Sequence, residues 1–219
     1  MLDIVEMVLT LSGEAPNPGA PVFLVRFSGC NLDCLYCDTP HKDEKNLSLS
    51  REELINRIRQ ETRAYPGLSL LFTGGEPLLG DRQDILLSMI AEFPATQFFI
   101  ETNGSVKIRD FSLPNCHFVV DWKTASSGCG ASFCFDNLGH LHPRRDCIKL
   151  VINREDLSSV LEIISTIRAE NHLLPVYLSP QHNALDLRET AEFILEHKLP
   201  ASLSLQLHKL IWQEKVRGV

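Results

Sequence analysis

Short runs of apolar and β-branched residues alternate along this chain with segments whose apolar positions recur every three or four residues. The first pattern is typical of buried strands, and the second is typical of helices that cover a sheet. The apolar runs predict strands over residues 21–27, 68–72, 96–100, 118–120, 148–152, 176–178 and 203–205. The periodic segments predict a helix that opens at Ser50 and helices over residues 82–93, 155–169 and 187–196. With about six strand-and-helix units, we expect one α/β domain, residues 1–219, with mostly parallel strands, folded as an incomplete TIM-like barrel rather than a closed eight-fold one.

The start of the first helix has a specific signal. The Ser50 hydroxyl can accept from a backbone amide of the first turn while Glu53 reaches back, which is a capping box. Leu54, Ile55 and Ile58 then supply an apolar face at helical spacing.

Two long stretches, residues 32–49 and 126–143, lack either pattern. Loops of this length are uncommon in a compact domain unless they serve a function. Parallel sheets build their sites from loops at the carboxyl ends of the strands. The first stretch directly follows a predicted strand, so we expect it to contribute to such a site.

The composition is that of a soluble domain, with 44% hydrophobic and 22% charged residues. The 28 acidic and 21 basic side chains give a net charge of -7, which argues against a nucleic-acid partner. No apolar run approaches the ~20 residues that a membrane span needs, and Asp3 and Glu6 lie where a signal peptide would be basic. Seven cysteines, an odd number, fit a disulfide framework poorly. We therefore expect a cytoplasmic protein with reduced thiols and no membrane partner.

Three of the cysteines, Cys30, Cys34 and Cys37, form a C-x3-C-x2-C cluster directly after the strand of residues 21–27. Three thiolates on one short loop can bind three irons of a [4Fe-4S] cluster and leave the fourth iron open. An open iron can bind the amino and carboxylate groups of S-adenosylmethionine. The alternative is a zinc site completed by His41 or Cys129, although zinc sites more often use C-x2-C pairs.

This cysteine spacing resembles that of the radical S-adenosylmethionine superfamily. A second motif, at residues 73–77, has the sequence Thr-Gly-Gly-Glu-Pro. On its own it is a strand-to-helix turn, but two glycines also let a backbone approach a ligand closely. The resemblance implies that Gly75 and Glu76 hold the methionine amino group.

The residues that flank these motifs resemble the family of 7-carboxy-7-deazaguanine synthases. The matching segments are residues 11–19, 26–32, 36–39, 73–79, 101–104, 121–128 and 206–209. The resemblance implies ring contraction of 6-carboxy-5,6,7,8-tetrahydropterin to 7-carboxy-7-deazaguanine with loss of ammonia, on the route to queuosine and other deazapurines. It also implies a [4Fe-4S] cluster, S-adenosylmethionine, Mg2+, a reducing electron donor of flavodoxin-like type and a homodimer.

The resemblance also implies residue roles. Thr39 would bind Mg2+, which prefers oxygen ligands. Arg26 would hold the substrate carboxylate, because Val25 and Phe27 face the opposite side of the strand and leave Arg26 directed to the barrel interior or its mouth. The other implied substrate contacts are Leu11, Ser12, Gly13, Glu14 and Thr73. The other implied cofactor contacts are Tyr36, Asp38, Asp121, Lys123, Ser126, Ser127 and Gln181.

Several alternatives stay open at this point. The composition of the segment from Leu11 to Glu14 fits an ordinary surface loop as well as it fits a substrate-binding loop. The cysteine cluster and the Gly-Gly-Glu-Pro also occur in activating enzymes for glycyl-radical partners, and the cysteines alone would also suit a non-enzymatic zinc-binding module. The chain departs from the family pattern at Ala15 and Ala125, and residues 129–143 are a variable segment. The remaining cysteines, Cys116, Cys129, Cys134 and Cys147, match no family role, and buried thiols are their default interpretation.

Overall fold

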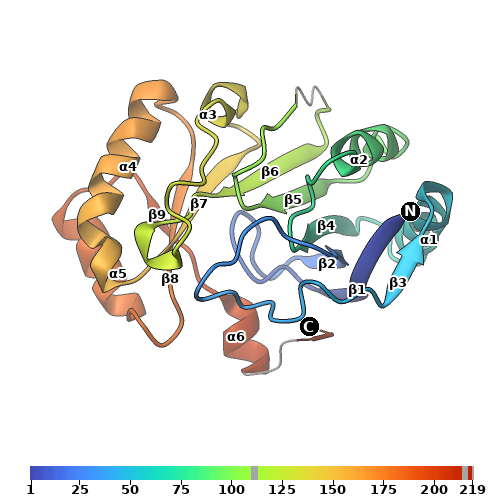
Figure 1. Ribbon diagram of the computed structural model, residues 1–219, viewed down its shortest axis with the longest axis horizontal. Helices are drawn as coiled ribbons and strands as arrows, with labels where there is room; N and C mark the ends of the chain where they lie inside the picture. The colour runs from blue at the N-terminus through green and yellow to red at the C-terminus, as the bar shows by residue number, and fades with distance from the viewer. Residues whose placement is uncertain (110–112, 214–216, 219) are drawn as a thin grey trace.

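The computed structural model describes residues 1–109, 113–213 and 217–218, and it has one nine-stranded sheet with most of its helices packed on the outer side (Figure 1). The strands are β1 (Leu2–Leu11), β2 (Pro21–Phe27), β3 (Leu47–Leu49), β4 (Ser69–Gly74), β5 (Phe98–Thr102), β6 (Cys116–Asp121), β7 (Cys147–Ile152), β8 (Val176–Pro180) and β9 (Ser202–Leu203). The α-helices are α1 (Arg51–Ala64), α2 (Arg82–Ile90), α3 (Asn137–His140), α4 (Leu157–Glu170), α5 (Leu187–Glu196) and α6 (Leu207–Trp212). Two 3-10 turns, η1 (Ala125–Ser127) and η2 (Arg154–Asp156), complete the set.

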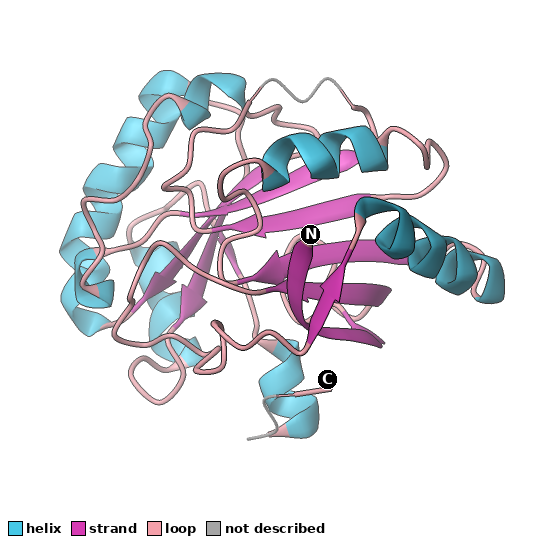
Figure 2. Ribbon diagram, turned by 45° about the vertical axis from the view of Figure 1, so that its right-hand side comes forward, coloured by secondary structure: helices cyan, strands magenta, loops and turns pink. Residues whose placement is uncertain are grey.

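The sheet is mostly parallel and does not close. Its strand order is β3-β1-β2-β4-β5-β6-β7-β8-β9, and every neighbouring pair from β2 to β9 is parallel. β1 pairs antiparallel with both β2 and β3. The curved sheet with two free edges, visible in Figure 2, confirms the predicted incomplete barrel.

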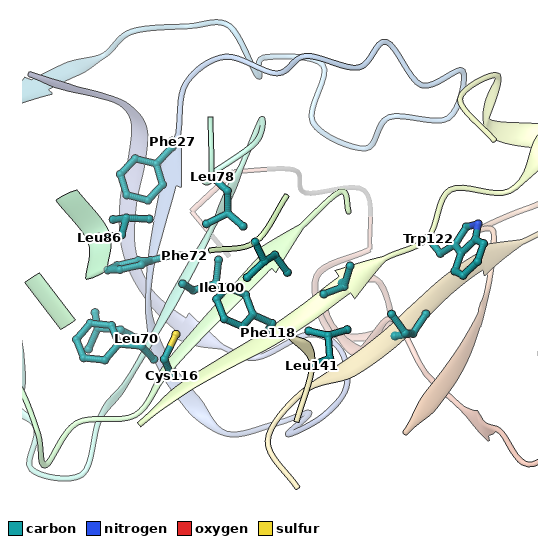
Figure 3. Packing of buried hydrophobic residues seen from close by; sticks show 14 of the residues in the cluster. Phe27, Leu70, Phe72, Leu78, Leu86, Ile100, Cys116, Phe118, Trp122 and Leu141 are labelled. Carbon is teal, nitrogen blue, oxygen red and sulfur yellow. The ribbon is translucent and has the colours of Figure 1, made fainter. Parts of the chain in front are cut away.

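The two faces of the sheet carry different side chains. On β2, Phe23, Val25 and Phe27 point outward into the main core, which also contains Leu54 of α1 and Leu86 of α2. The rings of Phe27 and Phe72 meet edge to face at 5.6 Å, close to Leu86 (Figure 3). The intervening positions face inward, which leaves the inner side of the sheet for the site.

Most predicted elements are present with shifted ends. Ser50 forms the predicted capping box with Glu53, and Leu54, Ile55 and Ile58 are buried as expected. The helix predicted over 82–93 ends at Ile90, and the helix predicted over 155–169 begins with the 3-10 turn η2. The last strand lies at Ser202–Leu203 rather than at residues 203–205.

Strand β1 is the largest element that the sequence pattern did not predict. Its register on β2 shifts between Ile4 and Glu6, and the adjacent residues Ile4 and Val5 are both buried. A bulge of this kind breaks the two-residue alternation that marks a strand. The short elements β3 and α3 lie inside the two stretches that were expected to be loops, and α6 was also not predicted. Among the described residues, no helix is long and apolar enough to cross a membrane.

Candidate functional site

A cavity of about 470 Å³ lies on the inner side of the sheet, at the carboxyl ends of the parallel strands. Five neighbouring strands place polar residues in its wall: Arg26 from β2, Thr73 from β4, Glu101 and Thr102 from β5, Asp121 from β6 and Lys149 from β7. Arg26 lies opposite Thr73 and Asp121 lies opposite Lys149 in the strand register. The parallel register therefore gathers these groups on one inner surface.

The three cysteines of the C-x3-C-x2-C loop all line this cavity. All are free thiols, and the Cys30 sulfur accepts hydrogen bonds from the Leu32 amide at 3.4 Å and from Asn103 Nδ2 at 3.7 Å. Three thiols on one loop, with N–H donors directed at a sulfur, fit an iron–sulfur cluster held by three cysteines. Within the described residues, no three His, Cys, Asp or Glu side chains lie close enough together to hold a single metal ion.

Burial changes the pKa values of two of the cysteine thiols in this loop. It raises the pKa of Cys30 and raises the pKa of Cys34 to about 12. Because metal ligands must be thiolates, binding of a cluster at this loop must release protons.

The Gly-Gly-Glu-Pro motif packs directly against the cysteine loop. The Gly75 amide donates to the Phe27 carbonyl at 3.0 Å, and the Glu76 amide donates to the Gly29 carbonyl at 2.8 Å. A Cβ at Gly75 would lie 2.0 Å from the Gly29 carbonyl oxygen. Only glycine therefore permits this approach of the β4 end to the residue before Cys30.

The Glu76 side chain is enclosed in the protein, and its exposed fraction is 0%. Its carboxylate accepts hydrogen bonds from the Leu78 amide, the Thr102 hydroxyl and the Asn103 amide at 2.7–2.9 Å. These bonds connect the end of β4 to the end of β5. Burial raises the pKa of Glu76, against the opposing effect of these donors.

Thr39 and Asp38 form an oxygen-rich part of the cavity wall beside Arg26. The Thr39 hydroxyl donates to Asp38 Oδ1 at 3.3 Å and accepts from Arg26 Nη1 at 3.4 Å. A hydroxyl and a carboxylate side by side suit Mg2+. Arg26 also donates through Nε to Glu6 Oε1 at 2.7 Å, so Glu6 holds the guanidinium from the β1 side.

Charged groups of opposite sign alternate across the cavity wall. Lys149 Nζ lies 2.7 Å from Glu14 Oε2 and 3.9 Å from Asp121 Oδ2, and Lys123 Nζ lies 2.7 Å from the same Asp121 oxygen. Glu101 accepts a hydrogen bond from the Thr73 hydroxyl at 2.9 Å. Burial raises the pKa of Glu101, and the opposite charge of Lys149 limits that rise.

The structure brings most of the predicted site residues together. The cavity wall contains Leu11, Gly13, Glu14, Arg26, Cys30, Cys34, Tyr36, Cys37, Asp38, Thr39, Thr73, Gly75, Asp121, Lys123 and Gln181. In the described part of the chain, four predicted residues do not line it: Ser12, Glu76, Ser126 and Ser127. The Ser126 hydroxyl donates to Asp156 at 2.5 Å and the Ser127 hydroxyl donates to the Thr124 carbonyl at 2.6 Å. Both serines thus stabilise the turn that supports the cluster loop, where the Leu35 amide donates to the Ser127 carbonyl.

Sequence reasoning missed several residues of the site. They are Glu6, Glu101, Asn103, Lys149, Gln206 and His208, of which all except Glu6 line the cavity. A usable signal was present for Lys149, because a lysine inside the apolar run Cys147–Ile152 must find a buried anion. Of the cysteines without a family role, Cys116 and Cys147 are buried, as expected, while Cys129 and Cys134 are half-buried.

Comparisons with known proteins agree with this site. The sequence model of the Radical SAM superfamily matches residues 24–113, which include the cysteine loop and the Gly-Gly-Glu-Pro motif. The 7-carboxy-7-deazaguanine synthase of Clostridium acetobutylicum is 31% identical over 99% of this chain and 98% of its own length. The 7-carboxy-7-deazaguanine synthase of Chlorobaculum tepidum is 32% identical over 100% of this chain and 97% of its own length.

The fold comparison gives the same architecture. The crystal structure of QueE from Escherichia coli superposes with a TM-score of 0.72 at 23% identity, and the match covers 93% of this chain and 92% of the other. Similarity over nearly the whole length favours one family over the glycyl-radical activating enzymes and the zinc-binding module, which the cysteines alone left open. The chain belongs to the 7-carboxy-7-deazaguanine synthase family of the radical SAM superfamily.

Proposed function

We propose that this protein converts 6-carboxy-5,6,7,8-tetrahydropterin to 7-carboxy-7-deazaguanine with loss of ammonia. The main support for this proposal is that the three free cysteines, Arg26 and Glu14 all line the same cavity. The cysteines suit a radical-generating cofactor, and the charged pair of side chains suits a substrate with a carboxylate and N–H donors. Membership of the radical SAM superfamily implies a [4Fe-4S] cluster and S-adenosylmethionine, and the family also uses Mg2+.

The cluster would be held by Cys30, Cys34 and Cys37. When bound, the cluster and S-adenosylmethionine supply a 5′-deoxyadenosyl radical, which removes hydrogen from C6 of the substrate. The backbone at Gly75 and Glu76 would lie along S-adenosylmethionine, with Tyr36, Asp121, Lys123 and Gln181 as further wall residues of its site. Since the Glu76 carboxylate is already held by three donors, its contribution is to fix the turn that presents this backbone.

The substrate would be held at both ends. Arg26 donates through Nη1 to Thr39 and through Nε to Glu6, so Nη2 and the second hydrogen of Nη1 remain to bind a carboxylate, with Mg2+ at Thr39 and Asp38 beside it. Glu14 and the backbone of residues 11–13 would accept from the N–H edge of the pterin, and Thr73 would contact the ring between them. Ser12 supports this loop, because its hydroxyl donates to the Glu14 carbonyl at 3.2 Å.

We also propose the wider setting. The protein would act as a single radical SAM domain in the cytoplasm, as a homodimer, with a flavodoxin-like protein as the electron donor. A radical SAM enzyme that acts on a small molecule needs such a reductant.

Anaerobic reconstitution tests the proposal. The protein is incubated with iron, sulfide and thiol, and then with reductant, S-adenosylmethionine, Mg2+ and carboxytetrahydropterin, and mass spectrometry follows carboxydeazaguanine. We expect product from the wild type and none from Cys34→Ala. A wild type with full cluster content that forms no product would contradict the proposed reaction.

A further inference from the structure

Lys149 is a charged residue in a strand that is otherwise apolar. All six residues of β7 are buried, and the Ile148 and Leu150 side chains point into the main core. Strand alternation turns Lys149 to the opposite face, where it lines the cavity with 8% of its surface exposed. A buried ammonium is costly unless it is paired and hydrogen-bonded, so its partners define what it does.

The groups around Lys149 come from four other parts of the chain. Lys149 donates to Glu14 Oε2 at 2.7 Å, on the loop that follows β1. It lies 3.9 Å from Asp121 on β6, whose nearer partner is Lys123. Glu101 on β5 and His208 of α6 also face this charge cluster. Lys149 therefore lies between the proposed substrate side, at Glu14, and the proposed cofactor side, at Asp121.

The Glu14 carboxylate has two side-chain donors among the described residues. Lys149 donates to one oxygen, and Gln206 Nε2 donates to the other at 3.2 Å. Glu14 is itself 8% exposed, so little water is available to replace a lost donor. The Leu207 amide donates to the Gly13 carbonyl at 2.7 Å and so attaches the loop that contains Glu14. This backbone hydrogen bond does not orient the Glu14 carboxylate.

Ionisation of the pair depends on the same contact. Burial raises the pKa of Glu14, but the charge and hydrogen bond of Lys149, together with smaller contributions from His208 and Gln206, outweigh it and lower that pKa to about 2. Burial lowers the pKa of Lys149, but Glu14, Asp121 and Glu101 together raise it well above its ordinary value. Glu14 is consequently a carboxylate near neutral pH, which is the state that accepts hydrogen bonds from N–H groups.

We propose that Lys149 is a positioning residue for the substrate: its ammonium orients the Glu14 carboxylate toward the N–H edge of the pterin. This inference rests on the proposed function and adds a residue to it. Removal of Lys149 would leave Glu14 with Gln206 as its remaining side-chain donor among the described residues and would favour uptake of a proton in a buried site. A carboxylate held at one oxygen, or a protonated one, is a weaker acceptor of N–H bonds. S-adenosylmethionine binding would change much less, because Lys123 remains on Asp121.

The experiment compares reconstituted wild type with Lys149→Met, Lys149→Arg, Glu14→Gln and the double variant Lys149→Met/Glu14→Gln. Cluster content, kcat, and KM for both carboxytetrahydropterin and S-adenosylmethionine are measured. Lys107→Met is the matched control, since Lys107 forms an exposed ion pair with Asp136 outside the cavity wall. Product formation by the wild type tests the proposed function separately.

We expect Lys149→Met to raise KM for the pterin at least tenfold while cluster content and KM for S-adenosylmethionine stay within twofold. Lys149→Arg should recover most of the loss, and the double variant should be no worse than Glu14→Gln alone. The double variant also removes the unpaired buried charge, so it keeps the test valid if Lys149→Met does not fold. An unchanged KM for the pterin in Lys149→Met, or a tenfold further loss in the double variant over Glu14→Gln, would overturn the inference while leaving the proposed function standing.

Discussion

The Arg26 guanidinium is held by Glu6, with 2.7 Å between Arg26 Nε and Glu6 Oε1 across the β1–β2 pair. Each side chain is 15% exposed, so the pair is mostly shielded from water. An arginine held through Nε presents its two Nη groups in a fixed plane, which is the geometry that binds a carboxylate in two-pronged fashion. Glu6 thus pre-orients the group that we assign to the substrate carboxylate.

Loss of this contact should weaken substrate binding. Glu6→Gln replaces an ion pair with a hydrogen bond from the guanidinium to an uncharged amide oxygen, a change worth about 1.5 kcal/mol or roughly tenfold in KM for the pterin. Steady-state kinetics at saturating S-adenosylmethionine measure it. Glu192→Gln, which removes an exposed ion pair to Arg188, is the control and should leave KM unchanged. Equal KM values for Glu6→Gln and wild type would show that Arg26 does not need Glu6.

The approach of Gly75 to Gly29 predicts a strict requirement for glycine. In Gly75→Ala, the added methyl group would overlap the Gly29 carbonyl and the Cys30 amide, both of which are backbone atoms. We expect the cysteine loop to be displaced and iron content after reconstitution to fall at least fivefold. Gly139→Ala meets no atom within 4 Å and serves as the control. Normal iron content and absorption near 400 nm in Gly75→Ala would contradict the close packing.

The hydroxyl of Thr39 gives a separate prediction for the metal ion. Thr39→Ala removes one oxygen beside Asp38 and Arg26 but no thiol. The variant should keep its cluster colour and lose most of its activation by Mg2+, measured as rate against Mg2+ concentration. A parallel loss of iron and of the Mg2+ response would indicate that Thr39 supports the loop rather than the ion.

The Glu14–Lys149 pair predicts a pH dependence of stability. Because the folded-state pKa of Glu14 is about 2 and its ordinary value is 4.5, the pair stabilises the fold fully above pH 4.5 and progressively less as the pH falls toward 2. Between pH 6 and pH 3 the free energy of unfolding of wild type should therefore fall by about 2 kcal/mol more than that of Glu14→Gln. Urea unfolding of the cluster-free proteins, followed by tryptophan fluorescence, measures this difference. Buried acids with a raised pKa, such as Asp146, change the free energy of unfolding in the opposite direction as the pH falls. Because both proteins contain them, their effect cancels in the difference between the two. Parallel pH curves would contradict the assigned ionisation.

The fold could be predicted from sequence wherever one face of an element is continuously apolar. The helix at Ser50 and the strands from β4 to β8 have such faces, and their existence follows from periodicity alone. Strand β1 could not be found in this way, because its bulge places Ile4 and Val5 both in the interior. β1 pairs with β2, the next strand along the chain, and with β3, which begins only at Leu47, and no local pattern names this second partner.

The site residues likewise differ in how far the sequence could predict them. The cysteines and the glycine turn are local motifs, so their spacing predicts their chemistry. Glu6, Glu101 and Lys149 act through partners on other strands or loops, and no local pattern names those partners. For Ser126 and Ser127, contact with the cofactor stays a prediction, and the structure adds that their hydroxyls donate to Asp156 and to the Thr124 carbonyl.

Transfer of the C6 hydrogen tests the central claim most directly. Carboxytetrahydropterin that carries deuterium at C6 is incubated anaerobically with reconstituted wild type, reductant, S-adenosylmethionine and Mg2+, and both products are analysed by mass spectrometry. We predict carboxydeazaguanine together with 5′-deoxyadenosine that has gained deuterium. Formation of 5′-deoxyadenosine without deuterium and without carboxydeazaguanine would contradict the assignment of this cavity to radical ring contraction.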